Sequence, residues 1–155
     1  MIPLSDIDLL SLQTHLRLSH DLHGAPIVFD PIRKKNVRAT PEEIVRQLWL
    51  LYFLEKLGLN PKMIAVERSI LIHKMKRRFD LVVFSKSTDA ILLVELKAPE
   101  ITINQATFDQ IAQYNMGMQV PYALVSNGAK HYCFSIDDQK KEFRFLKKLP
   151  TEITS

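Results

Sequence analysis

The sequence predicts one α/β domain in which helices pack on a mixed sheet. Two stretches, at about 41–57 and 103–118, carry apolar side chains at helical spacing, whereas the other apolar runs are short and bounded by turn-forming residues. The expected order is helix, three strands, helix, strand, with an N-terminal accessory hairpin before it and extra C-terminal strands after it. We therefore expect a single domain over 1–155, with an accessory segment at 1–30 and a core at about 40–136.

The composition is that of an ordinary globular protein. Of the 155 residues, 46% are hydrophobic and 25% are charged, and the formal net charge is +4, which favours polyanionic partners. The one cysteine, Cys133, excludes an internal disulfide framework and fits a reducing compartment. The chain opens without a charged-then-apolar leader and holds no apolar run near the roughly twenty residues of a membrane span. We therefore expect a cytoplasmic protein with no membrane partner.

The N-terminal residues predict a small hairpin followed by an exposed loop. Apolar and polar residues alternate over 12–18, and the apolar run Ile27–Phe29 follows turn-forming residues at His23–Pro26. The basic run Arg33–Arg38 is expected to be an exposed loop that can face phosphate groups.

Thr40, Pro41 and Glu43 predict the start of the first helix. Thr40 is a good N-cap, Pro41 suits the first helical position, and Glu43 completes a capping box. Gly58 is expected to end the helix. A strand over 64–72 follows.

The most informative stretch is a predicted hairpin of two near-continuous apolar strands. These runs, Leu81–Phe84 and Ile91–Val94, flank polar turn residues, as expected for a buried hairpin. We expect Ser85 to pair with Ala90, which fixes the register of the two strands.

That register brings three polar side chains together. Asp80 then lies opposite Glu95, and Lys97 shares the face of Glu95 because side chains alternate along a strand. Two adjacent carboxylates repel each other unless a cation lies between them, and Mg²⁺ accepts one or two carboxylates. A lysine beside such an ion can hold the attacking water or offset charge on phosphorus. The alternative is a solvated polar trio with a weak Glu95–Lys97 ion pair.

Four positive charges immediately precede Asp80. They lie at Lys74, Lys76, Arg77 and Arg78. Phosphate contacts dominate affinity for DNA, so this run is a candidate DNA-binding segment. The alternative for any one of these residues is a solvated turn.

Thr102 and Gln105 predict a second capping box, which opens the helix at about 103–118. Gln110 and Tyr114 are four residues apart and therefore share one face of this helix.

Turn signals organise the C-terminal part into strands. Asn127-Gly128 predicts a tight hairpin between strands at Pro121–Val125 and Lys130–Ile136. Phe143, Phe145 and Leu149 indicate a last edge element.

Linked motifs resemble the PD-(D/E)XK nuclease superfamily. They are Asp80, Glu-Leu-Lys at 95–97, and Gln110-x-x-x-Tyr114. The segments at 30–35, 40–47, 95–100, 110–115 and 126–128 look more closely like the N-terminal nuclease domain of type I restriction enzyme R subunits. The resemblance covers about 27–149 and implies a restriction-endonuclease-like core. Phe79 stands where the family name has proline, a common departure.

The resemblance also implies roles for individual residues. Asp80 and Glu95 would bind Mg²⁺ or Mn²⁺, and Lys97 would assist the attacking water. Gln110 and Tyr114 would support the site and contact DNA. Glu43 matches an acidic position of the first helix that can add to the metal shell, although the capping box also explains it.

We therefore expect a metal-dependent DNA endonuclease of the R-subunit type, with DNA and other restriction-system subunits as partners. The sequence has no Gly-x-x-x-x-Gly-Lys-Ser/Thr motif, so this chain is not an ATP-driven translocase by itself. One alternative is a catalytically silent module of the same fold that binds DNA or a partner protein. Another is a structural or oligomerisation domain, such as a homodimer that associates through strand edges near the C-terminus.

Overall fold

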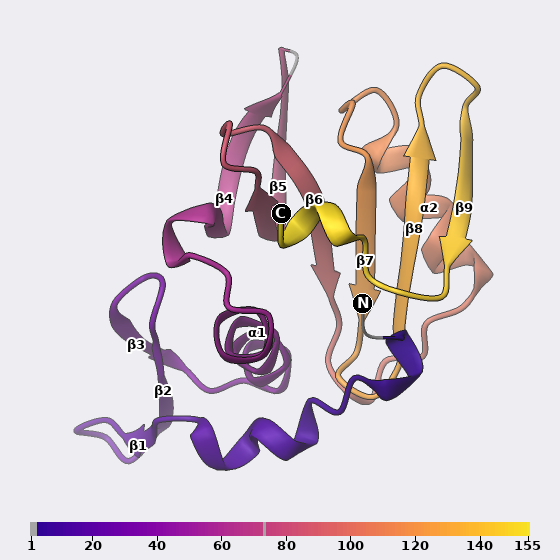
Figure 1. Ribbon diagram of the computed structural model, residues 1–155. Coiled ribbons are helices and arrows are strands. Elements are labelled where there is room, and N and C mark those ends of the chain that lie inside the picture. Colours follow the sequence, from indigo (N-terminus) through magenta and orange to yellow (C-terminus); the bar gives the residue numbers. More distant parts are fainter. Residues whose placement is uncertain (1–2, 73) are drawn as a thin grey trace.

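A computed structural model describes residues 3–72 and 74–155, which form a mixed α/β domain with two sheets (Figure 1). The helices are α1 (Pro41–Leu51), extended by a π-helical turn at Tyr52–Lys56, and α2 (Gln105–Asn115). The strands are β1 (Leu18–His20), β2 (Pro26–Asp30), β3 (Lys35–Arg38), β4 (Ile64–Ile72), β5 (Met75–Phe84), β6 (Ala90–Leu96), β7 (Tyr122–Ser126), β8 (His131–Asp137) and β9 (Glu142–Leu146). Short 3-10 helices lie at Leu4–Asp6, Leu10–His15, Pro61–Met63 and Thr151–Ile153.

The larger sheet has the strand order β4-β5-β6-β7-β8-β9. Strands β6 and β7 run parallel, and the other neighbouring pairs of the described strands are antiparallel. Parallel neighbours need a crossover connection, and α2 supplies it between β6 and β7. The predicted order of helix, three strands, helix, strand and extra C-terminal strands is therefore confirmed.

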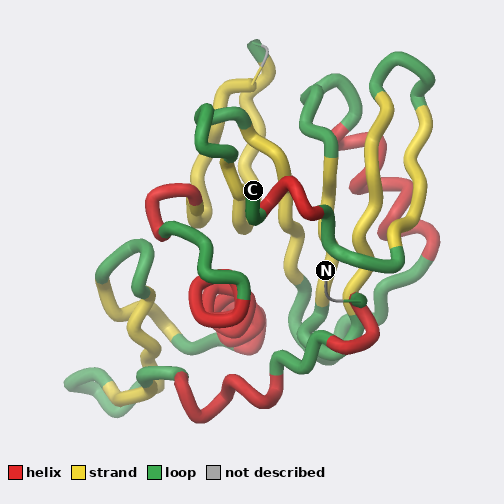
Figure 2. The backbone as a smooth tube through the Cα atoms, viewed as in Figure 1, coloured by secondary structure: helices red, strands yellow, loops and turns green. Residues whose placement is uncertain are grey.

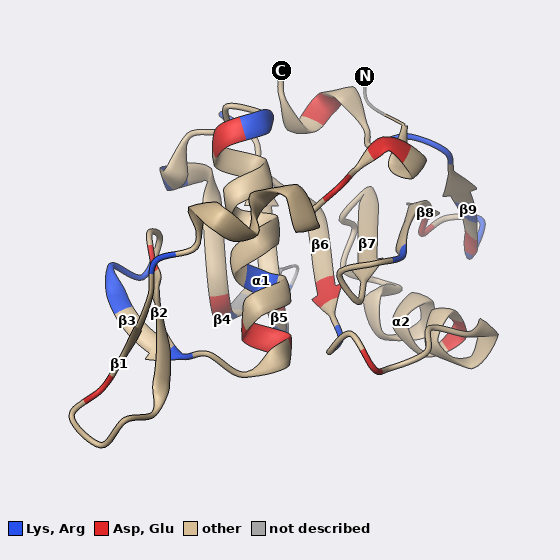
Figure 3. Cartoon of the chain, turned by 90° about the horizontal axis from the view of Figure 1, so that it is seen from below, with Lys and Arg blue, Asp and Glu red and all other residues tan. Residues whose placement is uncertain are grey.

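Alternating side chains of the sheet pack against different helices. On β7, Leu124 joins the apolar cluster that contains Val45 and Trp49 of α1. Its neighbours Ala123 and Val125 instead pack with Phe108 and Ile111 of α2. Successive side chains of a strand point to opposite faces, so α1 and α2 cover opposite faces of the sheet (Figures 1 and 3).

The predicted capping box of the second helix is wrong in its position. The N-cap is Asn104, whose side chain accepts a hydrogen bond from the Thr107 backbone N–H at 3.2 Å. The Thr107 hydroxyl in turn accepts from the Asn104 backbone N–H at 3.3 Å. Asn is as good an N-cap as Ser or Thr, and this reciprocal pair starts the helix later than the predicted Thr102.

The N-terminal segment contains more helix and strand than predicted. A hairpin does form between β1 and β2, but the alternating stretch 12–18 lies mostly in a 3-10 helix. The basic run was predicted as an exposed loop, whereas Lys35–Arg38 is strand β3, paired with β2. Leu9 and Leu12 are buried in the same cluster as α1. The accessory segment is therefore part of the main core.

The segments at 3–4 and 147–148 lie side by side next to the sheet (Figure 2). Pro3 forms a β-bridge with Lys148, and the Leu4 N–H donates to the Lys147 carbonyl at 2.9 Å. Among the described residues, no helix has the length and apolarity that a membrane crossing requires.

Candidate active site

The pairing of β5 with β6 brings Asp80 and Glu95 opposite each other. The register joins Leu81 to Val94 and continues through Val82 and Val83, as predicted. The next residues on the two strands are Asp80 and Glu95. The Leu96 N–H donates to Asp80 Oδ2 at 2.7 Å, which ties the Asp80 carboxylate to the end of β6.

The predicted pairing of Ser85 with Ala90 is wrong. Phe84 pairs with Ala90, and the register shifts between Val83 and Phe84. A β-bulge of this kind inserts one unpaired residue and leaves the register on its other side unchanged. The error therefore affects the turn end of the hairpin and not the end that carries Asp80.

Glu95 lies on the face of the sheet that α2 covers. Its parallel partner Val125 packs with α2, whereas its neighbours Val94 and Leu96 pack with α1. Burial, followed by the charge of Asp80, raises the pKa of Glu95 to about 7, and the positive charge of Lys97 opposes this rise. The pKa of Glu95 therefore responds to both of the other residues of the predicted trio, Asp80 and Lys97.

The pKa of Glu42 is affected by the same two charged residues, Asp80 and Lys97. Burial and the Asp80 carboxylate raise the pKa of Glu42, whereas Arg46 and Lys97 lower it. Glu42 lies in the first turn of α1 and also acts on Glu95. The acidic candidate of the first helix in the sequence analysis was Glu43, and Glu42 was not considered.

Glu43 itself points to two arginines. The Thr40 hydroxyl accepts a hydrogen bond from the Glu43 backbone N–H at 3.2 Å, so Thr40 is the N-cap, as predicted. The Glu43 carboxylate does not complete the expected capping box, because its two oxygens accept hydrogen bonds from Arg33 and Arg46. Arg46 also binds Asp80, with 2.9 Å between Nη2 and Oδ1.

Glu67 of β4 lies across from Asp80. Its neighbours pair in a continuous register, Val66 with Leu81 and Arg68 with Phe79. Its φ is 47°, a left-handed conformation that is rare for a residue with a side chain. Its carboxylate lies 3.1 Å from Arg33 and 3.5 Å or more from Arg46 and Arg78.

The side-chain alternation of β5 skips at Asp80. Leu81 packs in the cluster with α1, yet Phe79 packs against the ring of Tyr114 on α2, with 5.8 Å between ring centroids. Two residues of a regular strand that are two positions apart would share a face. Between Asp80 and the β4–β5 turn, the side chains therefore point to the opposite faces from those expected from the rest of the sheet.

Tyr114 contacts β5 just before Asp80. Its hydroxyl accepts a hydrogen bond from the Arg78 N–H at 3.3 Å, and the Arg77 guanidinium lies 5.1 Å from its ring centroid. Gln110 is exposed on the same helix. Both residues lie on the helix that covers the Glu95 face, and their part in catalysis stays a prediction.

The basic run before Asp80 divides between two faces. Lys76 and Arg78 are exposed and alternate with Arg77, which lies over Tyr114. Lys74 occupies the turn with φ at 66°. Lys74, Lys76 and Arg78 are therefore exposed, although Arg78 also lies 3.5 Å from Glu67, whereas Arg77 lies over the ring of Tyr114.

An open groove of about 480 Å³ adjoins the site. It is lined by residues of the β2–β3 turn and β3, the start of α1, Glu67 of β4 and the loop after β6. Figure 3 shows acidic positions of α1, β4 and β6 near one another at this end of the domain, with basic positions of β3 beside them. Within residues 3–72 and 74–155, no group of three or more His, Cys, Asp or Glu side chains is arranged to hold a metal.

Most of the chain matches one known protein family. Residues 41–150 match the family described as type I restriction enzyme R protein N terminus (HSDR_N). The chain belongs to this family. Membership associates the domain with restriction systems, with nuclease chemistry and with DNA. A comparison with curated individual proteins found no match.

The family match includes Asp80, Glu95, Lys97, Gln110 and Tyr114. It begins after the N-terminal sheet, so Arg33, which binds Glu43 and Glu67, lies outside it.

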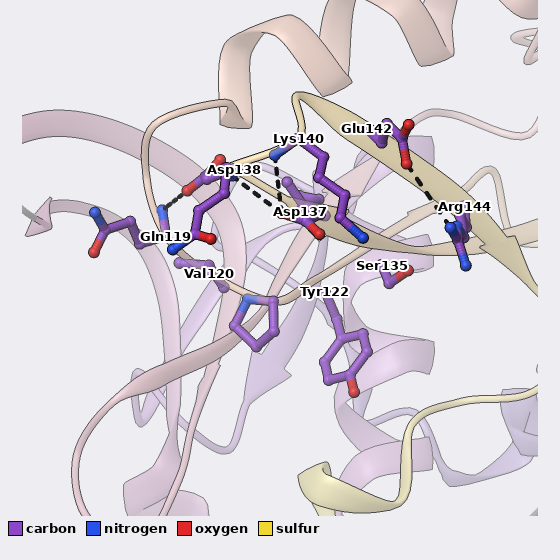
Figure 4. A pocket seen from close by; sticks show the side chains of 12 residues that line it. Gln119, Val120, Tyr122, Ser135, Asp137, Asp138, Lys140, Glu142 and Arg144 are labelled. Carbon is purple, nitrogen blue, oxygen red and sulfur yellow. Dashed lines mark hydrogen bonds and ion pairs between the residues drawn. The ribbon is translucent and has the colours of Figure 1, made fainter.

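A second cavity, of about 660 Å³, lies away from these residues of the R-protein family domain (Figure 4). It borders the start of β7, whereas Glu95 and Leu96 lie beside the end of β7. The carboxylate of Asp138 accepts hydrogen bonds from the Gly117 and Gln119 backbone N–H groups at 2.9 and 2.7 Å. These bonds join the loop before β7 to the turn after β8. Asp138, one of the polar residues that line this cavity, is therefore part of the turn structure.

Proposed function

We propose that this domain is a divalent-metal-dependent DNA nuclease with a restriction-endonuclease-like fold. Asp80 and Glu95 would hold Mg²⁺ or Mn²⁺, and Lys97 would orient the attacking water. The observation that supports the proposal is the register of β5 and β6, whose next residues beyond the pair Leu81–Val94 are Asp80 and Glu95. DNA and other restriction-system subunits are the proposed partners.

The charges around the site suit a divalent cation. The connected ion pairs join five carboxylates to three arginines, and Glu95 and Lys97 adjoin them. With every group ionised, six negative charges face four positive ones. Mg²⁺ is commonly held by one or two carboxylates and keeps several waters, so Asp80 and Glu95 suffice as protein ligands.

Each side chain then has a distinct task. A bound divalent ion would polarise a phosphoryl oxygen and make a bound water more acidic. The Lys97 ammonium would hold that water and offset charge on the phosphate. Lys76 and Arg78, exposed on the hairpin beyond Asp80, would bind the DNA backbone.

We assign the first-helix carboxylate to Glu42 in preference to Glu43. Glu42 lies 3.5 Å from Arg46 Nη2, the same nitrogen that contacts Asp80, whereas both oxygens of the Glu43 carboxylate accept hydrogen bonds from arginines. Glu42 would act through a metal-bound water and not as a direct ligand. Its side chain is 48% exposed. Among the described residues, no three His, Cys, Asp or Glu side chains are grouped to hold a metal together.

The decisive test is cleavage of supercoiled plasmid DNA. The purified domain should nick it with Mg²⁺ or Mn²⁺ but not with EDTA, and Asp80→Asn should abolish both nicking and Mn²⁺ binding measured by calorimetry. Nicking that Asp80→Asn leaves intact would come from another site or a contaminant and would refute the assignment.

A second candidate is a DNA-binding module without catalysis. The contact between Arg46 and Asp80 favours it, because a guanidinium already neutralises the carboxylate that a metal would use. This candidate predicts salt-sensitive DNA binding by the wild type, with no cleavage in any divalent metal.

A further inference from the structure

Five side chains form an alternating chain of charges that ends at Asp80. In order they are Asp30, Arg33, Glu43, Arg46 and Asp80. The first contact joins Arg33 Nε to Asp30 Oδ2 at 2.7 Å, and the last joins Arg46 Nη2 to Asp80 Oδ1 at 2.9 Å. Glu43 connects the two arginines. We call this set the ion-pair chain.

The starting point of the ion-pair chain is held firmly. Asp30 is fully buried at the end of β2, and its Oδ1 accepts the backbone N–H groups of Ile32 and Arg33, each at 2.7 Å. Gln47 of α1 donates to its Oδ2 at 2.9 Å. Burial alone would raise the pKa of Asp30, but the hydrogen bonds from Arg33 and Gln47 outweigh it and lower the pKa, which favours the ionised form.

The middle of the ion-pair chain is shielded from water. Glu43 and Arg46 are 5% and 4% exposed, so water cannot easily replace a lost partner. Removing one member of a buried ion pair leaves an uncompensated charge, and the remaining groups then move or change their contacts. A change at one end should therefore reach the other.

Arg33 has the geometry of a bridge between elements. Its three guanidinium nitrogens contact three different carboxylates: Asp30 of β2, Glu43 of α1 and Glu67 of β4. Lysine offers one compact ammonium group and cannot reproduce such a planar fork. The position therefore uses the shape of arginine as well as its charge.

We propose that Arg33 is a positioning residue of the candidate active site, which fixes the carboxylate of Asp80 through Glu43 and Arg46. The functional unit then includes the β2–β3 segment, which precedes the family match at 41–150. The consequence for catalysis rests on the proposed function, whereas the positioning of Asp80 does not.

The Leu96 amide reports directly on the position of Asp80, because its N–H donates to Asp80 Oδ2. The test compares backbone amide exchange by NMR in the metal-free wild type and in Arg33→Lys, which conserves the charge. We expect the Leu96 amide to exchange at least about tenfold faster in Arg33→Lys, because the bond that protects it is loosened. The amide of Leu93, inside the ladder, should keep its rate.

Arg17→Lys is the matched control. Arg17 is an exposed arginine of the same N-terminal segment and lies over the ring of Phe29, outside the ion-pair chain. It should leave the Leu96 amide unchanged. Glu43→Gln is the second variant: it interrupts the ion-pair chain at its centre and should reproduce the Leu96 effect if Arg33→Lys fails to fold.

The outcomes separate positioning from general stability. Unchanged exchange at Leu96 in Arg33→Lys, or equally accelerated exchange at Leu93 and Leu96, overturns the proposal. Mn²⁺ affinity gives the link to the metal: changes to residues that orient ligands typically cost 10- to 100-fold, and Arg33→Lys should show a loss of this order. A wild type that binds no Mn²⁺ would defeat the proposed function, and the Leu96 result would still decide the positioning.

Discussion

Glu95→Gln should stabilise the metal-free protein at alkaline pH and have little effect near pH 4.5. Burial and the nearby Asp80 raise the pKa of Glu95 from 4.5 to about 7. Between these values the folded protein keeps a proton that the unfolded chain has lost, so the free energy of unfolding falls as the pH rises. Each pKa unit corresponds to about 1.4 kcal/mol, so ionised Glu95 destabilises the fold by about 3 kcal/mol at pH 8. Glutamine has no charge to bury.

Thermal unfolding in EDTA between pH 4.5 and 8 measures this effect. For a domain of this size about 1 kcal/mol shifts Tm by about 2–4 °C, so Glu95→Gln should gain about 6–12 °C at pH 8 and progressively less toward pH 4.5. Glu100→Gln removes an exposed carboxylate a few residues later and should show no such pH-dependent gain. A gain that is constant with pH, or absent at pH 8, would refute the reasoning.

Three further changes test the site and the fold. Lys97→Ala should lower plasmid nicking by about 10²–10³-fold and preserve Mn²⁺ affinity in calorimetry, and undiminished nicking would remove Lys97 from the mechanism. Lys76→Ala and Arg78→Ala should each reduce the salt slope of DNA binding by about 1, and slopes equal to wild type would exclude them as phosphate contacts. Gly128→Ala should lower the free energy of unfolding, measured by urea titration, by about 1–2 kcal/mol. The φ of Gly128 is 93°, and the new methyl group would lie 3.2 Å from Val45. An unchanged urea midpoint would contradict this.

The hydrophobic pattern predicted the parts of the fold that depend on local sequence. The pairing of Leu81–Val83 with Leu92–Val94 follows from two apolar runs that must face each other, because a one-residue slip would turn every side chain over. This register is also what aligns Asp80 with Glu95. The turn end of the hairpin was mispredicted because a bulge has no strong signal in Ser85–Ala90.

The partners of the site residues depend on contacts between distant segments, and local rules did not predict them. Thr40 followed three residues later by Glu43 is a standard capping pattern, but the carboxylate found stronger partners in Arg33 and Arg46. Choosing between Glu42 and Glu43 requires the rotation of α1 about its axis relative to the sheet, which spacing within the helix does not supply.

The left-handed residue in β4 had no sequence signal either. Glycine usually marks such a backbone conformation, but here it is Glu67 that adopts φ of 47°. The conformation has a steric cost, and the Glu67 carboxylate lies near arginines from three separate segments of the chain. A residue of this kind is apparent only once β4, β5 and α1 have been placed together.

On the turn side of Glu67 and Asp80, the side chains of β4 and β5 point in directions that differ from those in the rest of the sheet. Before Asp80 the strands turn over, so that Phe79 and Arg77 pack on α2 while Lys76 and Arg78 remain exposed. Without that reversal, Phe79 would lie on the same side as Leu81, facing α1. Lys76 and Arg78 would then face α2, and Arg77 would be on the other side of the strand. The reversal at Glu67 and Asp80 therefore lets one strand supply a core residue, a candidate metal ligand and candidate phosphate contacts within six positions of one another.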